Sequence, residues 1–311
     1  MINSIEPEKN PLVIIGPGDD AGVYMLDKGL SIVETVDIIT PVVNEPFTFG
    51  AISAVNSLSD IYAMGGRPMT ALALLGFSSC DYEPDVIKKI LRGAIDILRK
   101  AGVSLMGGHS FEDSELKFGL SVTGRINEKE ILRSKGAKAG DILILTKSIG
   151  VGVLSTTLKA GKIKDKDMRH AIDSMLSLND KAASSALKAG ATSATDVTGF
   201  GLLGHAYNMV RDSKVDFEIN VKDVPVFDMV RDFIEGGMIP ERAYNNLRFL
   251  EGILDSGKSS EEDRLLLSDP QTSGGLLISL SPEKVKTFRG ESLTHWVIGR
   301  VINGKGRIRL T

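Results

Sequence analysis

Aspartates recur in this sequence at the ends of apolar segments and beside glycine. They are Asp19, Asp20, Asp37, Asp60 and Asp196. Hard divalent cations prefer carboxylate oxygens, and Mg²⁺ is commonly held by one or two carboxylates together with substrate phosphates. If these segments converge, they form a site for a metal ion and a polyphosphate. Aspartate also caps helices and starts turns, so each residue taken alone has a structural reading too.

Two glycine pairs offer a second part of such a site. Segment 107–110 reads Gly-Gly-His-Ser and follows an expected strand, and segment 272–275 reads Thr-Ser-Gly-Gly. Glycine lets the main chain approach a phosphate closely, and the N–H groups of such a turn bind anions. A plain tight turn is the alternative for both segments.

Other motifs argue against competing chemistries. Segment 199–204 matches the dinucleotide pattern G-x-G-x-x-G, which requires a strand directly before its first glycine. Segment 192–198 is short and polar there, whereas a buried parallel strand is a nearly continuous apolar run. We therefore expect no nicotinamide cofactor. The sequence has no G-x-S-x-G elbow and no zinc-type histidine pair. His205 is expected to be structural, because it lies on a predicted helix.

Periodicity and glycine positions predict the elements that carry these residues. A helix should follow Pro46 and stop at Gly65-Gly66, and an amphipathic helix should run from Pro84 to Lys100 with Gly102 as its cap. A further helix is expected to follow segment 199–204. Strands are expected at 12–15, 31–36, 69–75, 103–106, 142–145 and 215–221. The pattern is typical of a loop-rich α and β protein.

The bulk composition limits the function classes. The chain has 311 residues, enough for two domains, and we place their boundary in the polar segment 136–140, giving domains 1–138 and 139–311. A net charge of −3 gives no general attraction to nucleic acid or an anionic membrane. No apolar run reaches the roughly 18 residues of a membrane span. Cys80 is the single cysteine, which excludes an internal disulfide and fits a cytoplasmic protein.

Six segments in this order resemble those of the selenophosphate synthetases (selenide, water dikinases). They are G-D-D-A at 18–21, T-V-D at 35–37, L-S-D-I-Y-A-M-G-G at 58–66, G-G-H-S at 107–110, D-V-T-G-F-G-L-L-G-H at 196–205 and D-P-Q-T-S-G-G at 269–275. Each is modest alone, and the ordered set is specific. The wider superfamily includes aminoimidazole ribonucleotide synthetase, thiamine-monophosphate kinase and a hydrogenase-maturation protein. The third, fifth and sixth segments favour the selenium branch.

The resemblance implies an α+β fold of two aminoimidazole ribonucleotide synthetase-like domains, each a mixed sheet with packed helices, the first pairing in a homodimer. It implies that ATP, selenide and water give selenophosphate, AMP and phosphate, with Mg²⁺ and K⁺ required. The family's Mg²⁺ ligands match Asp20, Asp60 and Asp196. Its ATP-contacting positions match Pro17, Gly18, Asp19, Asp37, Asp60, Gly107, Gly108, His109 and Ser110.

One departure from the family lies at the start. Members carry a glycine-rich amino-terminal segment with a Cys or selenocysteine followed by a Lys, and Met1 to Asn10 contains no such segment. We carry these catalytic roles onto neither Lys9 nor Cys80. Three explanations for the missing segment are open. The chain has been trimmed, its reading frame starts after a UGA codon for selenocysteine, or it is a natural variant. The alternatives to selenophosphate synthesis are a non-catalytic ATP-binding homologue and another superfamily enzyme, such as a thiamine-monophosphate kinase.

Overall fold

The computed structural model describes residues 10–288 and 293–311 of the chain. The chain divides into two compact units, Met1–Ile131 and Leu132–Thr311, and each is described here by itself. The expectations about Lys9 and a missing catalytic segment fall almost wholly on residues 1–9, outside the described part. Among the residues that are described, no helix has the length and apolar character needed to cross a bilayer.

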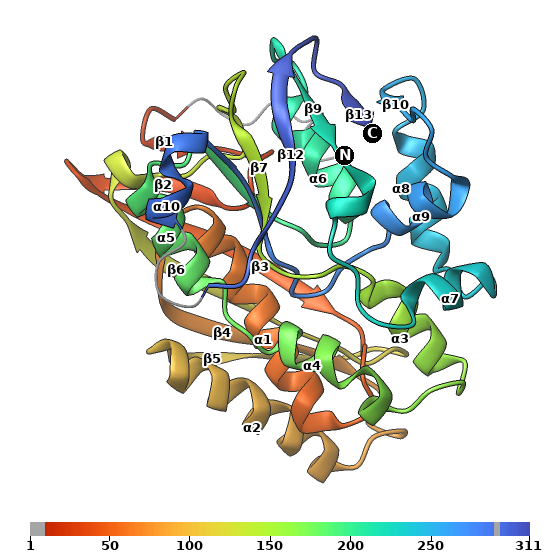
Figure 1. The fold of residues 1–311 in the computed structure, drawn as a ribbon. Coiled ribbons are helices and arrows are strands. Elements are labelled where there is room, and N and C mark those ends of the chain that lie inside the picture. Colours follow the sequence, from red (N-terminus) through yellow and green to blue (C-terminus); the bar gives the residue numbers. More distant parts are fainter. Residues whose placement is uncertain (1–9, 289–292) are drawn as a thin grey trace. The chain divides into compact units, whose positions relative to one another are not determined.

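The first unit is a six-stranded mixed sheet with two helices (Figure 1). The strands lie in the order β1-β2-β3-β6-β4-β5, and only β4 and β5 are parallel. Helix α1 packs on β3 and β6, and α2 packs on α1. The bounds are β1 Val13–Ile15, β2 Gly22–Asp27, β3 Leu30–Ile39, α1 Pro46–Ala63, β4 Arg67–Phe77, α2 Pro84–Ala101, β5 Ser104–Glu112 and β6 Lys117–Ile126.

Local chemistry explains both helices. Helix α1 starts where the Glu45 carboxylate accepts the N–H groups of Phe47 and Thr48, directly before Pro46, and every residue from Phe49 to Ala63 is buried. Helix α2 buries only one stripe, and it ends at Gly102, whose φ of 69° is the left-handed conformation that glycine adopts without strain. The sequence predictions for these two helices are confirmed.

The second unit is a seven-stranded mixed sheet in the order β10-β13-β9-β12-β7-β11-β8. Its strands are β7 Ile142–Leu145, β8 Ser193–Asp196, β9 Val215–Ile219, β10 Leu254–Asp255, β11 Leu276–Leu280, β12 Trp296–Asn303 and β13 Ile308–Leu310. Its helices are α3 Val151–Lys159, α4 Arg169–Met175, α5 Asp180–Ala189, α6 Gly201–Val210, α7 Val230–Glu235, α8 Glu241–Phe249, α9 Glu261–Leu267 and α10 Val285–Phe288. The expected α+β class, with a mixed sheet and packed helices in each unit, is confirmed.

Candidate functional site

The loop after β1 and the start of β3 enclose a pocket of about 470 Å³ in the first unit. Its polar lining includes Asp19, Asp20 and Thr35, and its apolar wall includes Ile15 and Tyr24. The Asp19 carboxylate accepts the main-chain N–H of Asp20 at 3.1 Å, which holds this acidic turn together. Two of the aspartates expected from the sequence therefore lie in one pocket.

Helix α1 and strand β3 hold two more of the expected aspartates, and one of them is bonded to the pocket residue Thr35. The Thr35 hydroxyl donates to Oδ2 of Asp60 at 2.5 Å, and Nδ2 of Asn56 donates to Oδ2 of Asp37 at 2.8 Å. Thr35 and Asp37 share a face of β3 because strand side chains alternate, and Asn56 and Asp60 share a face of α1 because they are four residues apart. Strand and helix thus hold both carboxylates in fixed positions.

Asp60 is the one charged residue on α1, and it is only 9% exposed. Burying a carboxylate among apolar side chains is unfavourable unless hydrogen bonds or a cation compensate it. The Thr35 bond supplies part of that compensation. A carboxylate bonded to Thr35, which lines the pocket with Asp19 and Asp20, suits a hard divalent cation that also binds phosphate oxygens.

The glycine pair at 107–110 is not a turn, and that expectation was wrong. All four residues belong to β5, an edge strand that pairs with β4. A Cβ on Gly108 would lie 2.2 Å from the carbonyl oxygen of Ala73, so only glycine fits against β4. Gly107, with φ of 145°, follows the extra residue Met106 of a bulge. Close packing against β4 explains Gly108, and the backbone conformation of the bulge explains Gly107.

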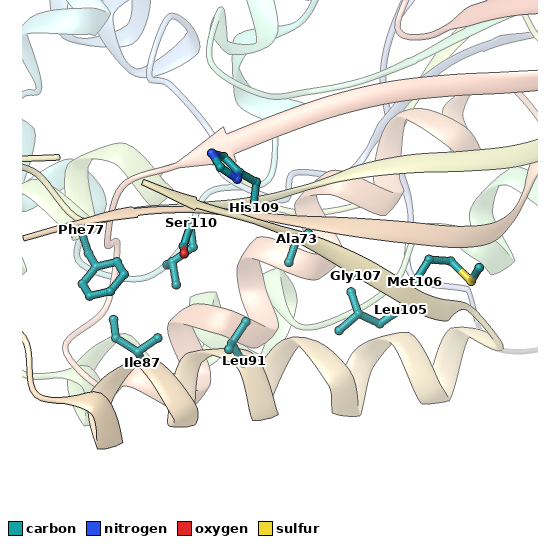
Figure 2. Close-up of a pocket in the computed structure, with 11 residues that line it drawn as sticks. Ala73, Phe77, Ile87, Leu91, Leu105, Met106, Gly107, His109 and Ser110 are labelled. Carbon is teal, nitrogen blue, oxygen red and sulfur yellow. The ribbon is translucent and has the colours of Figure 1, made fainter. Parts of the chain in front are cut away.

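The side of β5 that faces α2 closes an apolar cavity of about 590 Å³ (Figure 2). Figure 2 shows Ile87 and Leu91 of α2 facing Phe77 of β4, whereas His109 points away from α2. Apart from His109 and Ser110, the residues that line this cavity have no polar side chain to offer a triphosphate. The outward face of β5, which carries His109, is therefore the better candidate for the expected contact with ATP.

The remaining expected ligand, Asp196, belongs to the second unit. It is the last residue of β8 and is 2% exposed. The loop after it is fixed by His205 of α6, whose Nε2 accepts the main-chain N–H of Thr198 at 3.1 Å. Burial lowers the pKa of His205 to about 4, so the ring is neutral and keeps this acceptor near pH 7. The expected structural role of His205 is confirmed.

Segment 192–198 was expected to be too polar for a strand, and that reason against a dinucleotide site was wrong. Its polar residues 193–196 do form a strand, β8, and all four are buried. However, β8 is an edge strand that pairs antiparallel with β11, and three strands separate it from β9. A dinucleotide fingerprint needs a parallel β-α-β unit. We therefore still expect no nicotinamide cofactor, but because of the sheet topology and not because the strand is missing.

The segment Asp269-Pro270-Gln271-Thr272-Ser273-Gly274-Gly275 is internal rather than open to an anion. The Gln271 side-chain oxygen accepts the N–H groups of Gly150 and Val151, and Asp269 accepts that of Gly152, at the start of α3. Ser273 is 1% exposed. This segment therefore joins α3 to the sheet. Sequence reasoning also missed the buried Lys147, which contacts this segment and is considered below.

The expected metal ligands are thus divided, with Asp20 and Asp60 in the first unit and Asp196 in the second. Within residues 10–288 and 293–311, no three His, Cys, Asp or Glu side chains are grouped as a metal site. Mg²⁺ needs only one or two carboxylates when phosphates supply further oxygens. The carboxylates present fit that mode of binding.

Comparison with known proteins identifies the family. The sequence matches AIR synthase related protein, N-terminal domain, over residues 18–126, and AIR synthase related protein, C-terminal domain, over residues 138–310. A protein named selenide, water dikinase from Geobacter metallireducens is 46% identical over 281 residues, covering 90% of this chain and 82% of the relative. One of the same name from Campylobacter jejuni is 40% identical over 302 residues, covering 95% and 88%.

Solved structures share the fold at lower identity. A thiamine monophosphate kinase of Aquifex aeolicus has a TM-score of 0.69 at 17% identity, covering 95% of this chain and 91% of that one. The hydrogenase maturation protein HypE in complex with ATP has a TM-score of 0.69 at 17% identity, covering 97% and 87%. These likenesses show the fold alone, whereas the curated relatives are much closer in sequence. The chain therefore belongs to the AIR synthase related family and, within it, to the selenide, water dikinases.

Proposed function

We propose that this protein catalyses the ATP-dependent formation of selenophosphate from selenide and water, with AMP and phosphate as the other products. The structural observation that carries the proposal is the pairing of Thr35 with Asp60 and of Asn56 with Asp37 beside the acidic pocket. The names of relatives at 40–46% identity give the substrate. Selenide is easily oxidised, so the proposal places the reaction in the reducing cytoplasm.

Each expected site residue has a role in this proposal. Asp20, Asp60 and Asp196 would hold Mg²⁺, which supplies neutralisation of the phosphate charges when bound. Asp37 and the loop residues Pro17, Gly18 and Asp19 would position the nucleotide, as would segment 107–110. Thr35 keeps the Asp60 carboxylate oriented toward its ligand. Positioning and electrostatics of this kind carry most of phosphoryl transfer.

The proposal includes a homodimer formed through the first unit and a requirement for K⁺. Val36, Ile38 and Leu72 are 56%, 43% and 48% exposed, and they point away from α1 because Thr35 and Asp37 point toward it. Exposed apolar side chains gathered on one sheet face favour association. Sedimentation of the protein and of Val36→Glu tests the dimer, and replacement of K⁺ by Na⁺ in the assay tests the cation.

The decisive experiment is an anaerobic assay with Mg·ATP, run with and without selenide. We expect AMP and phosphate to accumulate together with a selenophosphate signal in the ³¹P NMR spectrum, and only when selenide is present. Because the two reactions differ only in selenide, a difference between their products shows that selenide is the phosphoryl acceptor.

Other outcomes would contradict the proposal in different ways. ADP formation with thiamine monophosphate as acceptor would indicate a superfamily kinase. Intact Mg·ATP affinity without any turnover would indicate a non-catalytic binding protein.

A further inference from the structure

Lys147 lies two residues after the end of β7, in the interior of the second unit. The residue is 8% exposed, and its Nζ donates to the main-chain carbonyls of Ser177 at 2.7 Å and of Ser273 at 2.9 Å. Burial lowers the pKa of this amine to about 7, and the Asp196 carboxylate partly opposes that shift. A lysine is rarely buried unless its head group is bound, so these contacts require an explanation.

The loop that Lys147 holds, residues 271–275, is fixed at several other points. Ser273 has a φ of 51°, an uncommon conformation for a residue with a side chain, and its hydroxyl donates to the carbonyl of Met175 at 2.6 Å. Nδ2 of Asn179 donates to the carbonyl of Gly274 at 2.9 Å. The connection between α4 and α5 therefore supports the loop from one side, and Lys147 joins the two.

On its other side the 271–275 loop contacts the segment that carries Asp196. The N–H of Val197 donates to the carbonyl of Gly275 at 2.9 Å, and Leu276 pairs with Asp196 in the sheet. A Cβ on Gly274 would lie 1.9 Å from the carbonyl oxygen of Val197, and one on Gly275 would lie 2.4 Å from the nitrogen of Lys147. The three main-chain segments are in direct contact, with no side chain between them.

We propose that Lys147 is a positioning residue for Asp196. By donating to the Ser273 carbonyl, its side-chain nitrogen fixes the 271–275 loop, and that loop in turn sets the position of Val197 and of the carboxylate before it. The inference rests on the proposed function in one respect, namely that Asp196 binds the metal of the Mg·ATP complex. Residues that orient a metal ligand typically change metal affinity by tenfold or more when altered.

The test compares Lys147→Met, which keeps the length of the side chain and removes its donors, with Lys181→Met, an exposed lysine of the same unit. Mn²⁺ binding, followed by electron paramagnetic resonance with a non-hydrolysable ATP analogue, should be about tenfold weaker in Lys147→Met and unchanged in the control. Affinity for the analogue in EDTA should be the same in all three proteins. Amide hydrogen exchange should quicken in 194–200 and 271–276 and remain unchanged elsewhere in the second unit.

Unchanged Mn²⁺ affinity in Lys147→Met would overturn the inference, and so would faster exchange spread evenly over the whole unit, since that indicates a general structural role. If Lys147→Met does not fold, Ser273→Ala provides the test, because it removes the hydroxyl that is bonded to Met175 and should loosen the same two segments. Wild-type protein that binds Mn²⁺ with the analogue and forms no selenophosphate would contradict the proposed function alone. Wild-type protein that does not bind Mn²⁺ with the analogue would contradict both.

Discussion

Thr35 donates a hydrogen bond of 2.5 Å to the carboxylate of Asp60, and this contact joins strand β3 to helix α1 next to the acidic pocket. Asp37, two residues along the strand, accepts from Asn56, one turn earlier on the helix, at 2.8 Å. Residues two apart on a strand lie on one face, as do residues four apart on a helix, so the two pairs can form side by side. Each carboxylate is therefore oriented by a neutral partner from the other element, before any ligand is bound.

Thr35→Val should weaken Mg·ATP binding while leaving the protein folded. Valine has the shape of threonine without the hydroxyl, so Asp60 loses a hydrogen bond and the substitution adds no bulk. A bond to a charged group contributes about 1.5–3 kcal/mol, so an affinity loss of about tenfold is expected. Isothermal titration calorimetry measures it, with Thr70→Val on β4 as the control. Equal affinities in the two variants would show that the Thr35 hydroxyl does not orient Asp60.

Asp60→Asn should weaken Mg·ATP binding more than Thr35→Val does. The substitution removes the negative charge that a hard cation prefers and keeps the side-chain size, so helix α1 should stay intact. Calorimetry with Mg·ATP is again the measurement, and Asp81→Asn, in an exposed turn of the same unit, is the control. An unchanged affinity in Asp60→Asn would remove Asp60 from the metal site.

Gly93→Ala should destabilise the first unit, although alanine normally favours a helix. A Cβ on Gly93 would lie 1.9 Å from the carbonyl oxygen of Phe47, and one on Gly50 would lie 1.9 Å from that of Ile90. Helices α1 and α2 thus approach main chain to main chain at these two glycines. Overpacking typically costs about 1–3 kcal/mol, which outweighs the gain in helix propensity of about 1 kcal/mol.

Differential scanning calorimetry should show a lower unfolding temperature for Gly93→Ala than for the wild type. Gly22→Ala is the matched control, because a Cβ there meets its nearest atom at an ordinary 3.8 Å. A Gly93→Ala protein as stable as the control would mean that the two helices can move apart without cost.

The sequence predicts the elements of this fold where local signals are strong. Helix α2 has an apolar stripe and a glycine cap, and both of its ends agree with the prediction within a residue. The metal and nucleotide residues were chosen by resemblance to a family, and the pocket contains Asp19 and Asp20 with Thr35 beside Asp60. Their roles as ligands remain predictions.

Other features could not be read from the sequence, because their causes lie in distant segments. Gly107 and Gly108 have the local pattern of a turn, and pairing with β4 makes them part of a strand, in which Gly108 lies close to Ala73. Residues 193–196 are more polar than an ordinary buried strand. They can be buried because the fold supplies polar partners, such as His205, whose Nδ1 lies 3.5 Å from Oγ1 of Thr195. Lys147 follows an apolar strand without any motif, and its two carbonyl partners are 30 and 126 residues away.

Asp269→Asn should stabilise the second unit at pH 8 relative to the wild type, and by much less at pH 5. Asp269 is fully buried, and burial raises the pKa of its carboxyl to about 8, although the N–H of Gly152 and the amide of Gln271 oppose the shift. Between about pH 4 and pH 8 the folded state keeps a proton that the unfolded state has lost. The stability is therefore greatest below the unfolded pKa and falls as the pH rises through that range, by up to about 1.4 kcal/mol per pH unit.

Asparagine resembles the neutral acid and does not titrate, so the difference between the variant and the wild type should grow steadily from pH 5 to pH 8. Urea unfolding followed by the fluorescence of Trp296 measures it, because this single tryptophan lies in β12 of the second unit. Asp180→Asn, at an exposed position at the start of α5, is the control. If Asp269→Asn behaved like Asp180→Asn, the Asp269 carboxyl would already be ionised in the folded protein at pH 5, and the interior around α3 would have to stabilise a charge that its hydrogen bonds alone do not account for.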